Sequence, residues 1–411
     1  MPVPSLPLEL VALIVEYLVP APDCAIGESN ADRRHRVLVG HTIGAVCRSW
    51  RPLGLKIAWR TLDIVLDLEH DEQFRRIWQP EVFDRVAPLI SHLRVAAGRQ
   101  IHLAGMARTF SERCTALTSL QLVHADTLDA FFLQASPHTL SRLVELTWEA
   151  PTSSTTSLNG VLLAASNLPS LRFLAIHATG GSFTLDRDLL TSLTSASTRR
   201  PRLRRLSLAL LGQHVQSSRR GIEVSPTVVS NISHTTTVLL GLLPTIFDLS
   251  SLIDLRLAGA LPIDSVQSLF SRLPPALPTL DVVLDAGSRS ADKRDGRDFL
   301  RRLPTLLTLF PRLQRLLFSS NCGACFIDTP DRAAAVLSAL PSTLRYILLP
   351  YNLHDAENDG LQRFLESSAR ARDFVLWLPE FADREGHRRW VAWRRKGDVW
   401  ERRPAQVPPR P

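Results

Sequence analysis

The sequence predicts an α/β protein in which a small all-α helical module precedes a curved solenoid of strand–helix repeats. Three observations support this fold class: two apolar helix faces near the N-terminus, a strand pattern that recurs nine times, and further helix faces between its copies. At 411 residues, the chain can bury a large core and hold more than one domain. We expect the helical module at 1–65, the solenoid at 66–380, and a basic Trp- and Arg-rich cap with a Pro-rich tail at 381–411.

The first predicted helix follows Ser5, which can cap it, and places Pro7 in its first turn, where a missing N–H costs nothing. Pro20 and Pro22 end this helix. Its apolar residues recur at i, i+3, i+4, i+7 and i+8, the spacing of a single helix face: Leu10, Leu13, Ile14, Tyr17 and Leu18.

A second helix face is predicted just before Pro52, which is expected to stop it. This face consists of Val39, Ile43, Val46, Cys47 and Trp50. Two such short helices cannot enclose a core of their own. They either pack on the rest of the chain or dock onto a partner protein as helices in a groove.

Three features of this segment stand together: the Leu6-Pro7 start, the centre from Val46 to Trp50, and the later Trp59. Over about residues 5–62 they resemble an F-box, the segment by which substrate receptors attach to the Skp adaptor of an SCF-type (cullin-RING) ubiquitin ligase. The link at 20–36 is longer and more polar than the usual one. The resemblance implies attachment to a cullin through the adaptor, and adaptor contacts at Leu6, Pro7, Leu10, Ile14, Leu18, Val46, Cys47, Trp50 and Trp59.

After residue 80 the pattern Leu-x-x-Leu-x-Leu recurs, with other apolar residues allowed in place of leucine. Its nine copies begin at Ile90, Leu117, Leu143, Leu171, Leu203, Leu252, Leu277, Leu313 and Leu344. Most spacings lie near those of leucine-rich repeats, which are about 20–29 residues long. The repeat resembles that family, although its usual turn Asn or Cys is present only at Asn321 and Asn352. Because strand side chains alternate, the pattern leucines should point inward and the residues between them toward the concave side.

Helix faces are predicted between the strand copies, as in the set Val266, Leu269, Phe270 and Leu273. Further faces occur at 185–193, 333–340 and 361–365. Two long insertions interrupt the series, a polar one at 212–236 and a densely charged one at 285–298, which is expected to be mobile.

Composition and motifs argue against catalysis. The sequence contains no Gly-rich phosphate loop, His-Glu-x-x-His or nucleophile elbow. Cys322 and Cys325 are the one pair at metal or redox spacing, and they lack further ligands. We therefore expect no catalytic residue, no metal and no cofactor. Five sparse cysteines and no membrane-length apolar run suit a cytoplasmic or nuclear protein with no membrane partner.

The chain carries a net charge of +8, and residues 388–403 mix cations with aromatic residues. This segment either closes the solenoid, with Trp390 and Trp393 in the cap, or contacts nucleic acid or an acidic peptide. A strand is expected just before it, at 374–378.

These observations predict a substrate-recognition subunit of an SCF-type ubiquitin ligase, not an enzyme in itself. The solenoid would hold an unidentified protein substrate through concave strand positions such as Gln121, Thr147, Ser207, Arg256 and Asp281. One alternative is an interaction protein with no link to a ligase. A less favoured alternative is a nucleic-acid binder driven by positive charge.

Overall fold

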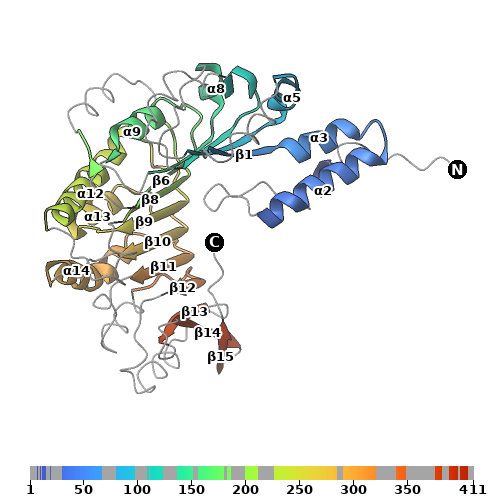
Figure 1. Ribbon diagram of the computed structural model, residues 1–411. Coiled ribbons are helices and arrows are strands. Elements are labelled where there is room, and N and C mark those ends of the chain that lie inside the picture. Colours follow the sequence, from blue (N-terminus) through green and yellow to red (C-terminus); the bar gives the residue numbers. More distant parts are fainter. Residues whose placement is uncertain are drawn as a thin grey trace. The chain divides into compact units, whose positions relative to one another are not determined.

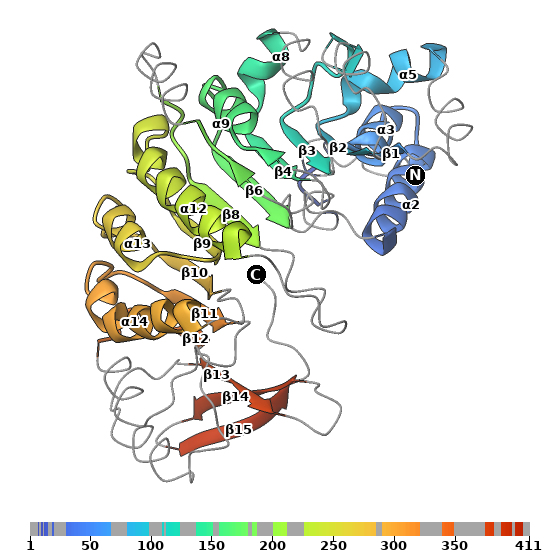
Figure 2. The ribbon, with the colours of Figure 1, turned by 60° about the vertical axis from the view of Figure 1, so that its left-hand side comes forward.

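The computed structural model shows an α/β protein in which parallel strands alternate along the chain with helices (Figures 1 and 2). Two compact units make up the chain, residues 1–151 with 160–175, and residues 152–159 with 176–411. The structure describes residues 7, 10, 12–14, 19, 30–66, 80–97, 109–110, 112–123, 137–150, 156–179, 183–186, 200–211, 226–284, 290–320, 339–348, 375–381, 388–396 and 399–405.

The first unit begins with two helices, α2 (Asn30–Val46) and α3 (Arg51–Trp59). They cross closely because small residues meet at the crossing. A Cβ atom added to Gly40 would lie 2.9 Å from the Cβ of Ala58, and one added to Gly54 would lie 2.6 Å from the nitrogen of Gly44. The side chains of Ile43, Trp50, Leu53 and Ile57 pack together beside these contacts.

The start of α2 and the role of Pro52 differ from the sequence predictions. Residues 30–36, expected to belong to the polar link, form the first turns of α2. Helix α2 ends at Val46, so Pro52 does not stop it. Pro52 instead lies in the first turn of α3, where its missing N–H has no helical partner to lose.

The sheet of the first unit starts directly after α3, within the range predicted for the helical module. Strand β1 runs parallel to β2, β2 to β3, and β3 to β4. Strand β6 follows β4 in the strand order, and the boundary between the two units falls within it. These strands are β1 (Thr61–Leu66), β2 (His92–Ala97), β3 (Ser119–Val123), β4 (Glu145–Glu149) and β6 (Phe173–Thr179). The short helices between them are α5 (Pro80–Val86), η2 (Ala87–Leu89), α8 (Pro137–Arg142) and α9 (Asn159–Ser166).

The second unit continues the alternation of strand and helix. Neighbouring strands from β8 to β13 are parallel: β8 (Arg205–Leu211), β9 (Asp254–Gly259), β10 (Thr279–Leu284), β11 (Arg315–Ser320), β12 (Tyr346–Leu348) and β13 (Val375–Phe381). Its helices are α12 (Pro226–Ile246), α13 (Ile263–Phe270) and α14 (Ser290–Leu307). A small separate pair joins β5 (Thr156–Ser157) to β7 (Phe183–Thr184).

All nine predicted strand sites form strands, which confirms the spaced-leucine pattern as a strand signal. The pattern leucines fill the core, as Leu255, Leu257 and Leu280 show with exposures of 0%. Strand starts repeat one backbone arrangement, in which two successive N–H groups donate to a single carbonyl of the preceding segment. Ser91 and His92 donate in this way to Arg60, at 2.9 and 3.0 Å, and Arg345 and Tyr346 to Gln314, at 2.8 and 3.1 Å.

Helix α13 confirms the face predicted at Val266, Leu269 and Phe270, since all three side chains are buried. The described parts of both insertions are helical, which for the 285–298 insertion differs from the mobility that was expected. Residues 226–236 belong to α12, and residues 290–298 belong to α14. In α14 the apolar end of the helix supplies the packing, because the Phe299 ring stacks on Phe318 of β11 at 5.5 Å. The faces predicted at 361–365 and most of those at 185–193 and 333–340 lie outside the described residues.

The chain closes with an antiparallel hairpin of β14 (Arg388–Lys396) and β15 (Val399–Ala405). Strand β14 pairs antiparallel with β13, which itself lies where the strand at 374–378 was expected. In the described part of the chain, no helix is both long and apolar enough to cross a bilayer.

Candidate functional site

Most of the predicted adaptor contacts that the structure describes are exposed. Leu10, Ile14 and Val46 expose 49%, 50% and 58% of their surface, and Pro7 and Cys47 are also exposed. Large apolar side chains in water forfeit about 1.5–3 kcal/mol each relative to burial. Leu6 and Leu18 lie outside the described residues.

The two predicted tryptophans have a different position. Trp50 is half-buried and packs with Ile57, which is the buried residue of the small core between α2 and α3. Trp59 at the end of α3 is half-buried as well. Trp50 therefore holds the helix pair together, so removing it would disturb the module itself as well as any surface it offers.

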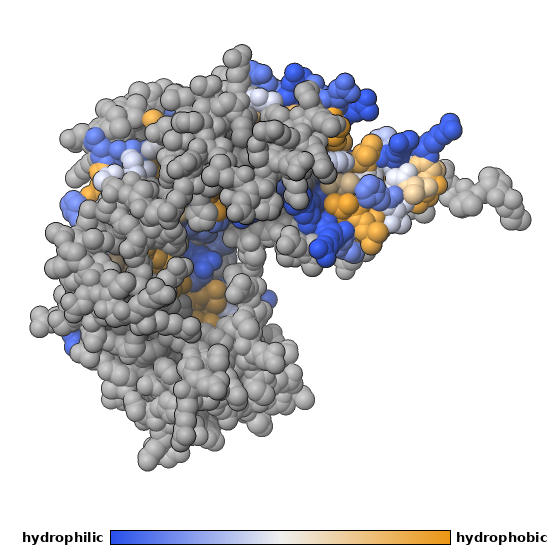
Figure 3. Space-filling view, in the orientation of Figure 1, coloured by the Kyte–Doolittle hydropathy of each residue, from blue (hydrophilic) through white to orange (hydrophobic). Residues whose placement is uncertain are grey.

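Leu38 and Leu55 are exposed apolar residues of the helix pair that are not among the adaptor contacts predicted from the sequence. They are 65% and 43% exposed, and Leu13 on the first helix is 62% exposed. Figure 3 shows orange, apolar residues on the helix pair next to blue, hydrophilic ones. The signal for Leu38 was its spacing of eight residues from Val46, which places both near one face of a helix. We use the term helix-pair surface for the exposed large apolar side chains of α2 and α3, which are Leu38, Val46 and Leu55.

A buried arginine joins this helix pair to the sheet. Arg36 is 1% exposed and donates hydrogen bonds to the carbonyls of Ile57 (3.1 Å), Ala58 and Thr61 (3.4 Å). These carbonyls lie at the C-terminal end of α3 and the start of β1, where a cation interacts favourably with the last carbonyls of a helix. The orientation of α3 relative to β1 is thereby fixed.

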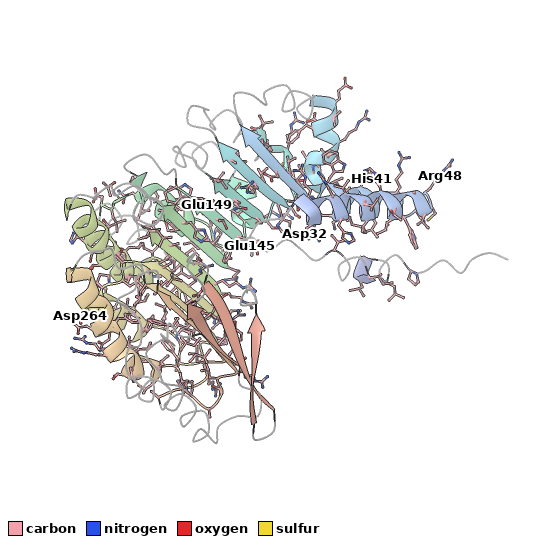
Figure 4. All side chains as sticks on the ribbon, turned by 60° about the horizontal axis from the view of Figure 1, so that its bottom comes forward. Asp32, His41, Arg48, Glu145, Glu149 and Asp264 are labelled. Carbon is pink, nitrogen blue, oxygen red and sulfur yellow. The ribbon has the colours of Figure 1, made fainter. Side chains whose placement is uncertain are left out.

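In the first unit, the polar residues of the sheet bond to each other across the strands. Gln121 on β3 donates to Glu149 on β4 at 2.9 Å, and Arg94 on β2 forms an ion pair with Asp63 on β1 at 3.0 Å. Figure 4 places Glu149 on strand β4 together with Glu145. Thr147 between them is 1% exposed.

Four of the five predicted substrate contacts are buried, which corrects the expectation that these strand positions face a partner directly. Gln121, Thr147, Ser207 and Asp281 expose between 1% and 9% of their surface. Strands in a sheet lie about 4.8 Å apart, so short central side chains are covered by longer cross-strand neighbours. Of the five, only Arg256 presents its side chain to solvent, with 46% exposed.

In the second unit, ionic and polar pairs also run across the strands. Arg256 on β9 forms an ion pair with Asp281 on β10 at 3.3 Å. Nε2 of His177 and Oγ of Ser207 form a hydrogen bond of 3.1 Å. The guanidinium of Arg315 on β11 lies over the Tyr346 ring on β12, 4.9 Å from its centroid.

The Asp281 carboxyl group titrates close to neutrality. Burial raises its pKa to about 6, and Asp254 raises it as well, while Arg256 and Arg315 act in the opposite direction. Desolvation of the charged form therefore outweighs the attraction of the two guanidinium groups. At neutral pH Asp281 is mainly ionised, and mild acidification removes its charge.

Two free cysteines lie within the described residues, Cys114, which is buried, and Cys47, which is exposed. Burial raises the pKa of the Cys114 thiol to about 12. The hydroxyl of Ser49, 3.0 Å from Sγ of Cys47, lowers the pKa of that exposed thiol. Cys322 and Cys325 lie outside the described residues, and within those described no three His, Cys, Asp or Glu residues gather as a metal site would require.

No protein-family model matches the sequence, and no curated protein does. Among solved structures, the chain is similar to the crystal structure of a Bacteroides fragilis protein determined by a structural genomics consortium, with 12% sequence identity and a TM-score of 0.32. That match covers 71% of this chain and 74% of the other. A similarity of this size supports no conclusion about function.

Proposed function

We propose that this protein is the substrate-recognition subunit of an SCF-type ubiquitin ligase. The N-terminal helices act as an F-box that binds the Skp adaptor and, through it, a cullin. The strand–helix repeats act as a leucine-rich-repeat-like solenoid that binds a protein substrate. Function by this route is scaffolding: it raises the concentration of the substrate beside the ubiquitin-charged enzyme.

The observation that carries the proposal is the helix-pair surface. Leu38, Val46 and Leu55 expose 65%, 58% and 43% of their surface on a module whose own core centres on Ile57. Exposed apolar residues grouped on one small module are typical of a site for another protein. An amphipathic helix pair of this kind suits a partner that offers a hydrophobic groove.

A second observation concerns the connection between the module and the repeats. Arg36 bonds to the end of α3 and to the start of β1, and Arg60 donates to the carbonyl of Val19 at 3.1 Å. A receptor that presents a substrate at a defined distance from its adaptor needs such a stiff connection between α3 and the first strand.

Co-purification with the recombinant Skp adaptor tests this proposal. Replacing both Val46 and Leu55 with Asp should abolish the binding, because each change places a charge in an apolar interface. Both positions are exposed, so the fold should tolerate the substitutions. The matched control replaces Ile253 and Leu309 of the second unit with Asp. These residues are 44% and 36% exposed, and the control variant should bind the adaptor normally. Equal adaptor recovery by both double variants would contradict the proposal.

A further inference from the structure

One side of the sheet in the second unit collects arginines in register. The strand pairing aligns Arg205, Asp254, Thr279, Arg315 and Tyr346 in one row. A neighbouring row contains Ser207, Arg256, Asp281, Leu317 and Leu348. Both rows lie on the side opposite the buried pattern leucines, since alternate strand residues point to opposite sides. We call Arg205, Arg256 and Arg315 the arginine face.

The positive charge of the arginine face is only partly neutralised. Arg256 pairs with Asp281, whereas Arg205 and Arg315 make no ion pair within the part of the chain that the structure describes. Arg205 is exposed and Arg315 is half-buried with its guanidinium over Tyr346. Figure 3 shows blue, hydrophilic residues visible on the strands of this unit beside orange ones. Among the described residues, the face therefore offers two guanidinium groups outside any ion pair, one of them stacked on Tyr346, and a third that a ligand could share with Asp281.

The strand register also contains basic positions on β14 and β15. Pairing through β12 and β13 aligns Arg315 with Arg394 of β14, and a neighbouring row reaches Arg403 of β15. On β14, Arg388 and Lys396 belong to the same alternate set of residues as Arg394. On β15, Glu401 pairs with Arg394 and is acidic. In their row, Tyr346 of β12 and Val375 of β13 separate Arg394 from Arg315.

We propose that the arginine face binds an extended acidic segment of a protein substrate, a chain of Asp and Glu residues. This inference rests on the proposed function and names the chemical class of its substrate. Guanidinium groups bind carboxylates by charge-assisted, often two-pronged hydrogen bonds. An extended acidic chain lying across parallel strands can contact arginines on several strands at once.

Two features favour an acidic protein segment over a nucleic acid. Binding of single strands uses aromatic rings as open platforms on which bases stack. The Tyr346 ring is already covered by the guanidinium of Arg315. In addition, Asp254 and Asp281 lie between the arginines. An extended peptide turns every second side chain away and can leave these two carboxylates unopposed, whereas every nucleotide of a nucleic acid carries a phosphate.

Asp281 acts in this arrangement as an internal competitor for Arg256. An incoming carboxylate must share Arg256 with Asp281, which lies 3.3 Å away. The charged groups around Asp281 are Arg256 and Asp254 on β9 and Arg315 on β11. Because burial raises the pKa of Asp281 to about 6, lowering the pH from 7.5 to 5.5 protonates it and frees Arg256. Ligand carboxylates, which titrate at about 4.3, stay charged over this interval.

Fluorescence anisotropy with the full-length protein tests the proposal. The probe is a labelled peptide of ten glutamates, compared with a peptide of ten glutamines and with a single-stranded RNA. Replacing Arg256 and Arg315 with Gln should weaken binding of the glutamate peptide about tenfold or more. Replacing Arg272 and Arg312, exposed arginines in turns between helix and strand, removes the same charge and should change the affinity less than about twofold. The Asp281→Asn variant should bind several-fold more tightly at pH 7.5 and lose the pH dependence.

Several outcomes would overturn the proposal. The first is equal binding of the glutamate and glutamine peptides. The second is undiminished binding of the glutamate peptide by the Arg256→Gln, Arg315→Gln variant. The third is binding of the RNA that is tighter than that of the glutamate peptide and is lost in the same variant. The Arg256→Lys, Arg315→Lys variant keeps the charge and should keep most of the affinity, which guards against loss of fold in the Gln variant. Adaptor recovery should be normal in all these variants, so a failure here is distinct from a failure of adaptor binding.

Discussion

Asp281 links the stability of this protein to pH. Burial raises its pKa to about 6 from an ordinary value of 3.8, so the folded state holds the proton more tightly than the unfolded chain does. The stabilisation that this proton provides is fully present below pH 3.8 and is lost as the pH rises through 6. The charged carboxylate, despite its pairing with Arg256, costs free energy in the folded state at neutral pH.

We expect the Asp281→Asn variant to gain stability relative to the natural protein as the pH rises from 4 to 7.5. A pKa difference of this size means that, relative to the natural protein, the variant's free energy of unfolding should rise by on the order of 2–3 kcal/mol over this pH range. Urea unfolding at several pH values measures it. If the two proteins showed parallel pH profiles, Asp281 would not titrate as described.

Gly54 allows the close crossing of α2 and α3. A Cβ at this position would meet the carbonyl oxygen of Gly40 and would lie 2.7 Å from the Cα of Gly44, both rigid backbone atoms. Gly54→Ala should therefore push the helices apart and destabilise the helix pair by about 1–3 kcal/mol. Gly44 is the matched control, because a Cβ there meets nothing nearer than 3.8 Å. Gly44→Ala should be neutral or stabilising by up to about 1 kcal/mol, the usual advantage of alanine in a helix.

Hydrogen exchange of the α2 and α3 amides compares these two variants. Faster exchange in Gly54→Ala and unchanged exchange in Gly44→Ala is the expected result. Equal protection in both variants would mean that the glycine crossing is not needed for packing. Adaptor recovery by Gly54→Ala should fall in parallel, since the helix-pair surface depends on the two helices remaining in contact.

At the scale of elements, β14 and β15 protect the backbone of β13. Strand β13 pairs on one side with β12 and on the other with β14, so removal of the hairpin leaves a free edge. A free edge strand recruits other chains through its unpaired N–H and C=O groups. We expect a chain shortened to residue 387 to self-associate.

Light scattering during size-exclusion chromatography measures this self-association. The full-length chain should have a lower mass than the shortened chain at the same concentration. A shortened chain of unchanged mass would show that the hairpin does not protect β13.

The elements that the sequence predicted well are those with a strong local period. Each spaced-leucine site forms a strand because three apolar residues at fixed spacing bury on one side of the sheet. Strand β1 was not assigned, although Trp59, Leu62 and Ile64 repeat the same spacing, because Trp59 had been assigned to the F-box resemblance. Trp59 fits both the F-box resemblance and the strand pattern, and the pairing of β1 with β2 shows that Leu62 and Ile64 form a strand.

Helix boundaries were predicted less well, for identifiable reasons. The early turns of α2 are polar, so no apolar face marks them, and the buried Arg36 within them is held by bonds to residues 21 to 25 positions later. The charged start of α14 reads as a mobile loop, yet Arg302 of this helix bonds to Asp264 of α13 at 2.7 Å. Both helices make contacts that are distant in sequence, and local composition does not reveal such contacts.

At the scale of the whole molecule, we propose one task for each of two surfaces. The helix-pair surface is apolar and suits a hydrophobic groove, while the arginine face is basic and suits an acidic chain. Of the five strand residues predicted from the sequence as substrate contacts, Arg256 is exposed and belongs to the arginine face. Gln121, Thr147, Ser207 and Asp281 are buried, and burial across strands depends on register, which spacing along the chain does not give.

The central claim is that the helix-pair surface attaches this protein to an SCF-type ligase. The most direct measurement is affinity purification of the full-length chain from cells with a blocked proteasome, followed by mass spectrometry. The Skp adaptor and a cullin should be recovered with the natural chain and with the Ile253→Asp, Leu309→Asp control, and should be lost with the Val46→Asp, Leu55→Asp variant. Recovery of neither protein with the natural chain, or equal recovery with both variants, would contradict the account.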